Sequence, residues 1–245
     1  MFMGEYKILL EGLPMSIAEN LASVKRNIEL ALARRRETPL TGPRVKVVAV
    51  TKNQEAAAVR EVLAAGAEAV GENRVQEAMA KAALLPPVEW HMIGHLQTNK
   101  VRQAVPFFTL IHSLDSERLA LEVERVAAKL GKRQDVLIQV NVAGEETKSG
   151  VAPGELMALA ELVSGLAHVR LCGLMTMAPF YEDAEQARPV FRELYRLFAE
   201  LKAAALPNTS IEWLSMGMTN DYCVAVEEGA NIVRIGTAIF GQRHY

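Results

Sequence analysis

The chain has 245 residues, half of them hydrophobic and 23% charged, so it is long enough to bury a large core. Its 27 basic and 29 acidic side chains nearly cancel to a net charge of -2, which argues against nucleic acid or an anionic membrane as the main partner. No leader-like segment and no apolar run of about 18 residues occurs. We therefore expect one domain, residues 1–245, that acts on a small molecule in the cytoplasm.

Metal and disulfide chemistry is not indicated. The two cysteines, Cys172 and Cys223, lack CxxC spacing and are expected to be reduced. His91 and His95 lie four residues apart, but their segment is predicted to be a strand and has no acidic partner. We expect both histidines to be ordinary core or rim residues and predict no metal site.

The chain opens with a helix and then alternates. Residues 16–36 predict an amphipathic helix behind a Ser16 cap, and its three final arginines suit a helix end. The valine-rich segment 45–52 predicts a short buried strand. Further strands are predicted at 67–73, 88–95, 108–115, 135–142, 169–178, 210–217 and 231–241. Helices are predicted at 54–65, from 74 to 84, after Gln97, at 116–130, after Pro153, at 183–205 and at 220–228.

Eight strands alternating with helices require parallel pairing through right-handed crossovers. In roughly 200 residues this predicts a single (β/α)8 TIM barrel with an extra N-terminal helix. An open doubly wound sheet is the alternative. It is weakened because no GxGxxG follows the first strand.

In such a barrel the chemistry lies at the carboxyl ends of the strands. Lys52 ends the first strand, where its amine could attack an aldehyde and form a Schiff base. A lysine that only extends into solvent is the structural alternative. Asn73 ends the second strand on the same face as Gly71 and Ala69, and these small residues would leave room for a ligand.

The ends of strands seven and eight predict a phosphate site. Ser215, Met216 and Gly217 end the seventh strand, and the eighth is expected to carry Arg234 together with Gly236 and Thr237. Barrels commonly bind phosphate there through backbone N–H groups. Glycines that only permit tight turns are the alternative. Arg234 would place a cation in the barrel mouth, unless it forms a structural ion pair with Glu72 or Glu227.

Seven motifs in this order resemble the pyridoxal-phosphate homeostasis protein family, whose barrel is of the alanine racemase type. The resemblance covers essentially the whole chain from the opening helix, and Thr51 and Thr219 stand where serine is more usual. The motifs are VAVTK ending in Lys52, GENRVQEA (71–78), WHMIGHLQTNK (90–100), NVAGEETKSG (141–150), GLMTMAP (173–179), SMGMTND (215–221) and VRIGTAIFG (233–241).

The resemblance implies that pyridoxal 5'-phosphate is held as a Schiff base on Lys52. It also implies that Arg234 faces the pyridine nitrogen and that Asn73 and Met216 line the ring. The residues that it assigns to the phosphate are Ser215, Gly217, Gly236 and Thr237. The family acts in vitamin B6 and amino-acid homeostasis, without an established turnover reaction.

Three functions remain open at this point. A monomeric carrier or buffer that hands pyridoxal phosphate to apo-enzymes is favoured, with no catalytic residue, because an arginine at the pyridine nitrogen weakens carbanion stabilisation. The chain also ends soon after its eighth strand, and Tyr222 and Tyr245, the tyrosines near the late strands, are not placed as an opposing acid/base. The alternatives are a weak amino-acid racemase or other pyridoxal-phosphate enzyme, and a Schiff-base aldolase or sugar-phosphate isomerase without a cofactor.

Overall fold

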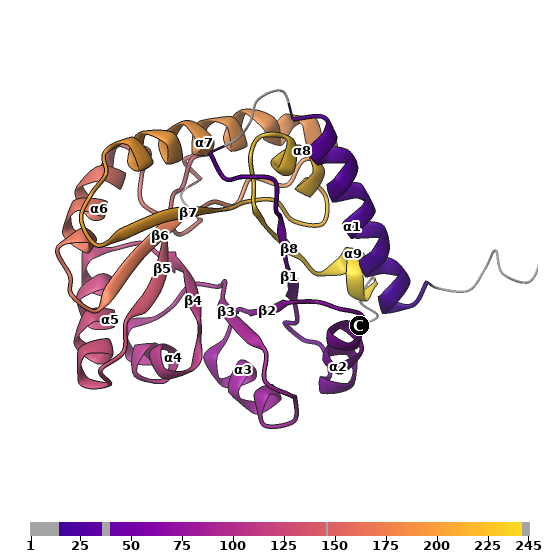
Figure 1. Cartoon of the computed structure of the whole chain (residues 1–245), viewed down its shortest axis with the longest axis horizontal. Helices are drawn as coiled ribbons and strands as arrows, with labels where there is room; N and C mark the ends of the chain where they lie inside the picture. Colours follow the sequence, from indigo (N-terminus) through magenta and orange to yellow (C-terminus); the bar gives the residue numbers. More distant parts are fainter. Residues whose placement is uncertain (1–14, 36–39, 146, 242–245) are drawn as a thin grey trace, which may run out of the picture.

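Eight parallel strands pair in chain order, and β1 pairs with β8, so the sheet closes into a barrel (Figure 1). The computed structural model describes residues 15–35, 40–145 and 147–241. This closure confirms the predicted barrel over the open sheet. The strands are β1 (Lys46–Val50), β2 (Ala69–Glu72), β3 (Glu89–Met92), β4 (Leu110–Leu114), β5 (Gln134–Gln139), β6 (Val169–Met175), β7 (Thr209–Ser215) and β8 (Ile232–Ile235).

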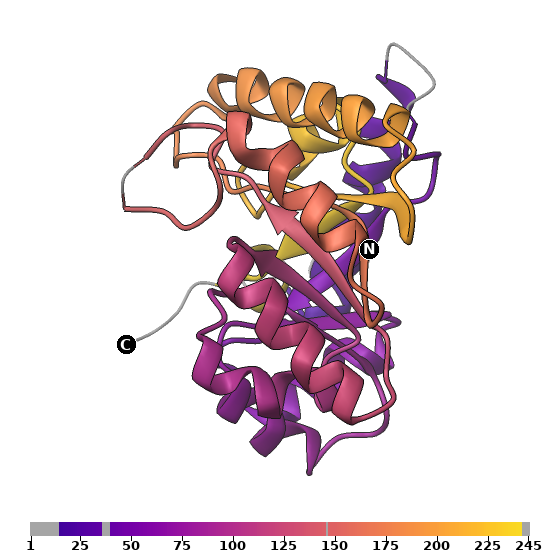
Figure 2. The ribbon, with the colours of Figure 1, turned by 90° about the vertical axis from the view of Figure 1, so that its left-hand side faces the viewer.

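Helices surround the strands, and in Figure 2 the orange α7 and the magenta α5 lie on opposite sides of them. None of the helices in the described ranges is long and apolar enough to span a membrane. The helices are α1 (Ile17–Ala33), α2 (Ala56–Ala64), α3 (Val75–Ala82), α4 (Val101–Phe107), α5 (Glu117–Lys129), α6 (Leu156–Ser164), α7 (Arg188–Ala203), α8 (Tyr222–Glu227) and α9 (Thr237–Phe240), with 3-10 turns η1 (Thr98–Lys100), η2 (Pro153–Glu155) and η3 (Ala184–Ala187).

The expected opening helix is α1, and a capping box starts it. The Glu19 N–H donates to Ser16 Oγ at 3.2 Å, and the Ser16 N–H donates to Glu19 Oε2 at 2.9 Å. The helix ends at Ala33, before the arginine run, of which Arg36 lies outside the described residues. Its apolar face packs against α8 and α9, next to β8, and so completes the outer ring (Figure 1).

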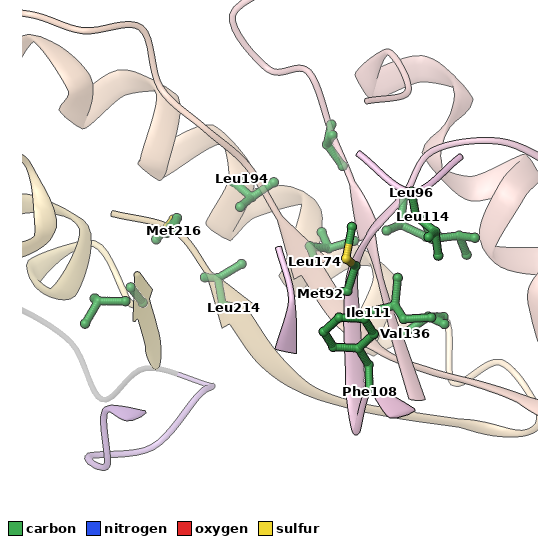
Figure 3. Packing of buried hydrophobic residues seen from close by; sticks show 14 of the residues in the cluster. Met92, Leu96, Phe108, Ile111, Leu114, Val136, Leu174, Leu194, Leu214 and Met216 are labelled. Atoms are coloured by element: carbon green, nitrogen blue, oxygen red, sulfur yellow. The ribbon is translucent and has the colours of Figure 1, made fainter. Parts of the chain in front are cut away.

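Two apolar layers hold the barrel together. The larger lies between strands and helices, where Leu194 of α7 and Leu214 of β7 are fully buried (Figure 3). The smaller fills the barrel interior with alternate strand residues, among them Val48, Leu137 and Cys172. Cys172 and Cys223 are free thiols, as expected. Burial raises the pKa of Cys172 to about 12, so this thiol is inert at neutral pH.

The last predicted strand, 231–241, is wrong in its second half. β8 ends at Ile235, and Gly236 leaves the extended conformation with φ -110° and ψ -82°. The N–H groups of Ile239 and Phe240 donate back to the Gly236 carbonyl at 2.9 and 3.0 Å, which starts α9. Gly236 and Thr237 therefore lie in the turn after the strand.

Candidate functional site

A cavity of about 640 Å³ lies at the carboxyl ends of the strands, within the usual size range of small-molecule sites. Five of the eight predicted site residues line it, and they come from the ends of β1, β2 and β8. These five are Lys52, Asn73, Arg234, Gly236 and Thr237.

Two lysines line this cavity, and their surroundings differ. Lys148 forms an ion pair with Glu145 at 2.5 Å and contacts the Ala178 carbonyl at 3.3 Å. Lys52 is half-buried and forms no ion pair within the described part of the chain. The Lys52 amine is therefore the better placed of the two to react with a ligand.

The residue before Lys52 is anchored to the neighbouring strand. The Thr51 hydroxyl donates to Glu72 Oε1 at 2.6 Å, and the Thr51 N–H donates to the Gly71 carbonyl at 3.0 Å. Lys81, from α3, donates to the Thr51 carbonyl at 2.5 Å and to Glu72 at 2.7 Å. Burial raises the pKa of Glu72, against the effect of Lys81.

Lys81 also holds the residue after Lys52, which is Asn53, through the side chain of Glu77. The Asn53 N–H donates to Glu77 Oε1 at 2.6 Å, and Lys81 donates to that oxygen at 2.8 Å. Partial burial opposes ionisation of Glu77, yet the hydrogen bonds from Lys81 and Asn53 hold its pKa below the usual value. Lys81 thus fixes both sides of Lys52, a role that the sequence analysis missed.

Small residues next to Asn73 serve packing rather than ligand space. A Cβ on Gly71 would lie 2.8 Å from Val48 Cγ1 and 2.9 Å from Ile93 Cδ1, so these side chains already fill the expected room. A Cβ on Gly94 would lie 2.7 Å from the Asn73 Cα. The two glycines therefore let strands and loop approach closely and present Asn73 at the cavity.

Arg234 is buried at the inner side of the cavity, with 3% of its surface exposed. Its Nη1 donates to Ser215 Oγ at 2.7 Å and its Nη2 to the Thr176 carbonyl at 2.8 Å. Desolvation lowers its pKa to about 10, with the Asp221 carboxylate opposing, so the guanidinium stays charged at neutral pH.

The two expected structural partners of Arg234 are engaged elsewhere. Glu72 pairs with Lys81 at 2.7 Å, and Glu227 pairs with Arg188 at 2.7 Å. Arg234 is therefore held by neutral acceptors rather than by either carboxylate.

Three of the predicted residues, Ser215, Met216 and Gly217, are not among those that line the cavity. Ser215 is fully buried behind Arg234. Met216 lies in the outer apolar layer (Figure 3), while Met177 and Met218 line the cavity.

Gly217 has a packing reason of its own. Its φ is +92°, and a Cβ there would lie 2.6 Å from the Ala225 Cβ and 2.9 Å from the Tyr222 Cα. Only glycine therefore fits between β7 and α8, as the turn alternative expects, and the contact of Gly217 with phosphate stays a prediction.

Gly236 and Thr237 bring backbone N–H groups and a hydroxyl to the cavity. They begin α9, whose first N–H groups have no partner within the helix. The next N–H, of Ala238, donates to Thr219 Oγ1 at 3.2 Å. Thr237 is exposed, so its hydroxyl is accessible to a ligand. Such donors suit a phosphate group.

Tyr181 and His95 are among the cavity residues that were not predicted as part of a site. Tyr181 is half-buried and lines the cavity, although only Tyr222 and Tyr245 were considered in the sequence. His95 also lines it, with its Nδ1 3.2 Å from Asp115 Oδ2. Tyr181 lies in the irregular connection between β6 and η3, where strand periodicity gives no guide to side-chain direction.

The remaining strand histidines lie inside the barrel. His91 and His112 are fully buried, and His91 Nδ1 lies 2.9 Å from His112 Nε2. His112 Nδ1 lies 2.9 Å from Ser215 Oγ. The expectation of a core histidine is confirmed for His91, and that of a rim histidine for His95. No cluster of three or more metal-ligating side chains was found in the described ranges.

Comparison with known proteins gives a consistent result. Residues 20–244 match the family model described as alanine racemase, N-terminal domain. A pyridoxal phosphate homeostasis protein of Aquifex aeolicus is 47% identical over 202 residues, covering 82% of this chain and 88% of its own. The human protein of that name is 39% identical, covering 92% and 86%.

Solved structures agree with the sequence matches. PipY of Synechococcus elongatus, solved with PLP bound, has a TM-score of 0.78 and 39% identity and covers 92% of this chain and 100% of its own. An alanine racemase of Corynebacterium glutamicum is 16% identical with a TM-score of 0.68, covering 94% and 61%. That second likeness is one of fold alone.

Proposed function

Because this chain belongs to the pyridoxal phosphate homeostasis protein family, we propose that it binds pyridoxal 5'-phosphate as a Schiff base on Lys52. We propose further that it serves vitamin B6 homeostasis as a carrier or buffer that hands the cofactor to apo-enzymes. The observation that supports this is the meeting of an amine, a buried cation and phosphate-type donors in one cavity. The carrier would act as a monomer in the cytoplasm.

The residues at the cavity fit this cofactor. Lys52 would hold its aldehyde carbon, and Arg234 would face its pyridine nitrogen. The Thr237 hydroxyl and the N–H groups of Gly236 and Thr237 would bind its phosphate, and Asn73 would line the ring. When bound, the cofactor supplies an electron sink for reactions of amines.

The three residues behind the cavity would act through their neighbours. Ser215 would fix Arg234, as their 2.7 Å hydrogen bond suggests. The Gly217 carbonyl accepts from the Arg234 N–H at 3.0 Å, which aligns β7 with β8. Met216 would support this part of the wall from the outer layer.

Arg234 favours a carrier over an enzyme. A guanidinium can only donate hydrogen bonds, so it would keep the pyridine nitrogen unprotonated. An unprotonated ring is a weaker electron sink, which disfavours transaminase-like chemistry. A weak racemase remains the second candidate because Tyr181 lines the cavity together with Lys52 and offers a second acid/base group.

One preparation can separate these functions. The protein loaded with pyridoxal phosphate is mixed with an apo-enzyme acceptor, with the free cofactor as a control, and alanine from a parallel incubation is analysed by chiral chromatography. We expect transfer without racemisation. Racemisation that is lost in both Lys52→Ala and Tyr181→Phe would favour the enzyme, and a colourless protein that takes up no cofactor would contradict the whole proposal.

A further inference from the structure

A continuous line of hydrogen bonds crosses the barrel interior. It runs from Glu89, at the amino end of β3 (called the lower end of the line below), to Arg234. Glu89 Oε1 lies 2.8 Å from His91 Nε2, and His91 Nδ1 lies 2.9 Å from His112 Nε2. His112 Nδ1 then lies 2.9 Å from Ser215 Oγ, to which Arg234 donates at 2.7 Å. The line begins on β3 and passes through β4 and β7 to β8.

The lower end of this line fixes the direction of its protons. The hydrogen bond from His91, aided by Lys46, lowers the pKa of Glu89 to about 2, so this carboxylate only accepts. The His91 proton must then lie on Nε2. Burial lowers the pKa of His91, so the ring is neutral and its Nδ1 is a bare acceptor for His112 Nε2–H.

The upper end fixes the same direction independently. Arg234 can only donate, so Ser215 Oγ accepts from it. The Ser215 hydroxyl proton has no other acceptor than His112 Nδ1, at 2.9 Å, among the described residues. Burial lowers the pKa of His112 well below the usual value, so the ring is neutral, and because its Nδ1 accepts, its one proton lies on Nε2. Both ends thus require every donor to point toward Glu89.

We propose that Glu89, His91 and His112 are positioning residues that orient the guanidinium of Arg234 through the Ser215 hydroxyl. The proposal rests on the proposed function only in so far as Arg234 faces a bound pyridine ring. The directed line turns the lone pair of Ser215 toward Arg234, because the hydroxyl proton is committed to His112. Arg234 is thereby held in one orientation by neutral acceptors, without a direct ion pair to a carboxylate of the described residues.

The ion pair at the lower end keeps the line in place. Lys46 donates to both carboxylate oxygens of Glu89 at 2.8 Å, and its ammonium lies 5.0 Å from the centre of the Trp213 ring. Lys46 is mostly buried, with 13% of its side chain exposed. The carboxylate is therefore fixed and ionised at the point where the line begins.

The proton positions can be tested without any cofactor. In the apo protein with ¹⁵N-labelled histidine, at neutral pH, we expect His91 and His112 to be neutral rings with the proton on Nε2. His91→Gln and His112→Gln variants assign the two sets of signals. An imidazolium, or a proton on Nδ1 of either ring, would overturn the proposal.

The effect on Arg234 needs variants of the line and a matched control. His112→Leu removes both contacts, whereas His112→Gln keeps an acceptor and a donor at similar spacing. The control is Ser113→Ala, because Ser113 is as buried as Ser215 but its hydroxyl has no hydrogen-bond partner in the described structure. The readouts are the dissociation constant for pyridoxal phosphate and the position of the visible absorption band of the complex.

We expect His112→Leu to weaken binding by about tenfold or more and to shift the band, since the band reports the group at the pyridine nitrogen. His112→Gln should largely restore both, and Ser113→Ala should change neither. A folded His112→Leu protein with an unchanged band and affinity would overturn the proposal. If that variant does not fold, Glu89→Gln takes its place, and it should shift the band in the same direction.

The two proposals fail differently. A wild-type protein that binds no pyridoxal phosphate would defeat the proposed function while leaving the proton positions measurable. Normal binding and normal transfer, combined with the wrong histidine tautomers, would defeat only the positioning role.

Discussion

Thr51 Oγ1 donates to Glu72 Oε1 across 2.6 Å, and this bond ties the residue before Lys52 to the end of the neighbouring strand. Lys81 completes the anchor by binding Glu72, Glu77 and the Thr51 carbonyl. The position of the Lys52 amine therefore depends on a lysine 29 residues further along the chain, which is not among the residues that line the cavity.

Lys81→Met should destabilise the fold by about 3–5 kcal/mol, because it leaves the buried Glu72 carboxylate without its cation. Urea unfolding measures the loss. Lys132→Met is the control, since Lys132 is half-buried but donates only to backbone carbonyls, and it should cost about 1 kcal/mol. Equal losses for the two variants would show that the Glu72 pair is not special.

Lys52→Ala should abolish covalent trapping of pyridoxal phosphate while leaving the barrel folded, because it removes a rim amine and not a core side chain. Borohydride reduction followed by peptide mass mapping locates the adduct. Lys148→Ala is the matched control from the same cavity and should keep the adduct on Lys52. An adduct mapped to Lys148 in the wild type would refute the assignment.

Thr237→Val should weaken binding of pyridoxal phosphate by about 1–2 kcal/mol and leave binding of pyridoxal nearly unchanged, because it deletes one hydrogen bond to phosphate. Ser215→Ala should weaken both ligands by a similar amount, since its hydroxyl contacts Arg234. Calorimetric titration with the two ligands measures the difference. If Thr237→Val weakened binding of pyridoxal phosphate and of pyridoxal equally, Thr237 would not contact the phosphate.

Stability should fall as the pH drops below about 6.5, the ordinary histidine value. Burial lowers the pKa of His112, so its ring stays neutral in the folded protein while the unfolded chain takes up the proton. The neutral ring contributes its full share to the free energy of unfolding at pH values above the histidine pKa of the unfolded chain. This contribution is lost as the pH falls, at up to about 1.4 kcal/mol per pH unit. In urea unfolding at several pH values, His112→Gln should show a smaller slope below pH 6.5 and a parallel curve above pH 7. An unchanged slope would contradict the lowered pKa.

Gly217→Ala should destabilise the protein more than Gly131→Ala. Both glycines have positive φ, but an added Cβ at Gly217 would lie 2.6 Å from the Ala225 Cβ, whereas Gly131 has nothing within 4 Å. The Gly131 change should cost about 1 kcal/mol from backbone strain alone, and the Gly217 change about 2–4 kcal/mol. Thermal unfolding of the two variants gives the comparison.

The order of elements and the side of the barrel that carries the site were readable from the sequence. Hydrophobic period and turn residues are local properties, so the eight strands and the helix before them could be placed, with edges off by a few residues. The polar strand ends then predicted that Lys52, Asn73 and Arg234 lie together at one cavity, because parallel strands in a closed barrel end at one mouth. The strand predicted from Gly236 onward was wrong, because the apolar residues there are as typical of a short helix as of a strand.

What only the tertiary structure decided is which polar side chains meet. Ser215 and His112 are 103 positions apart, and their 2.9 Å contact arises because inward-facing residues of β4 and β7 share one barrel interior. Neither Lys81 behind Lys52 nor Tyr181 at the cavity is marked by any local pattern. Alternation along a strand gives the face of each side chain, but barrel closure sets which faces come together, and that depends on all eight strands at once.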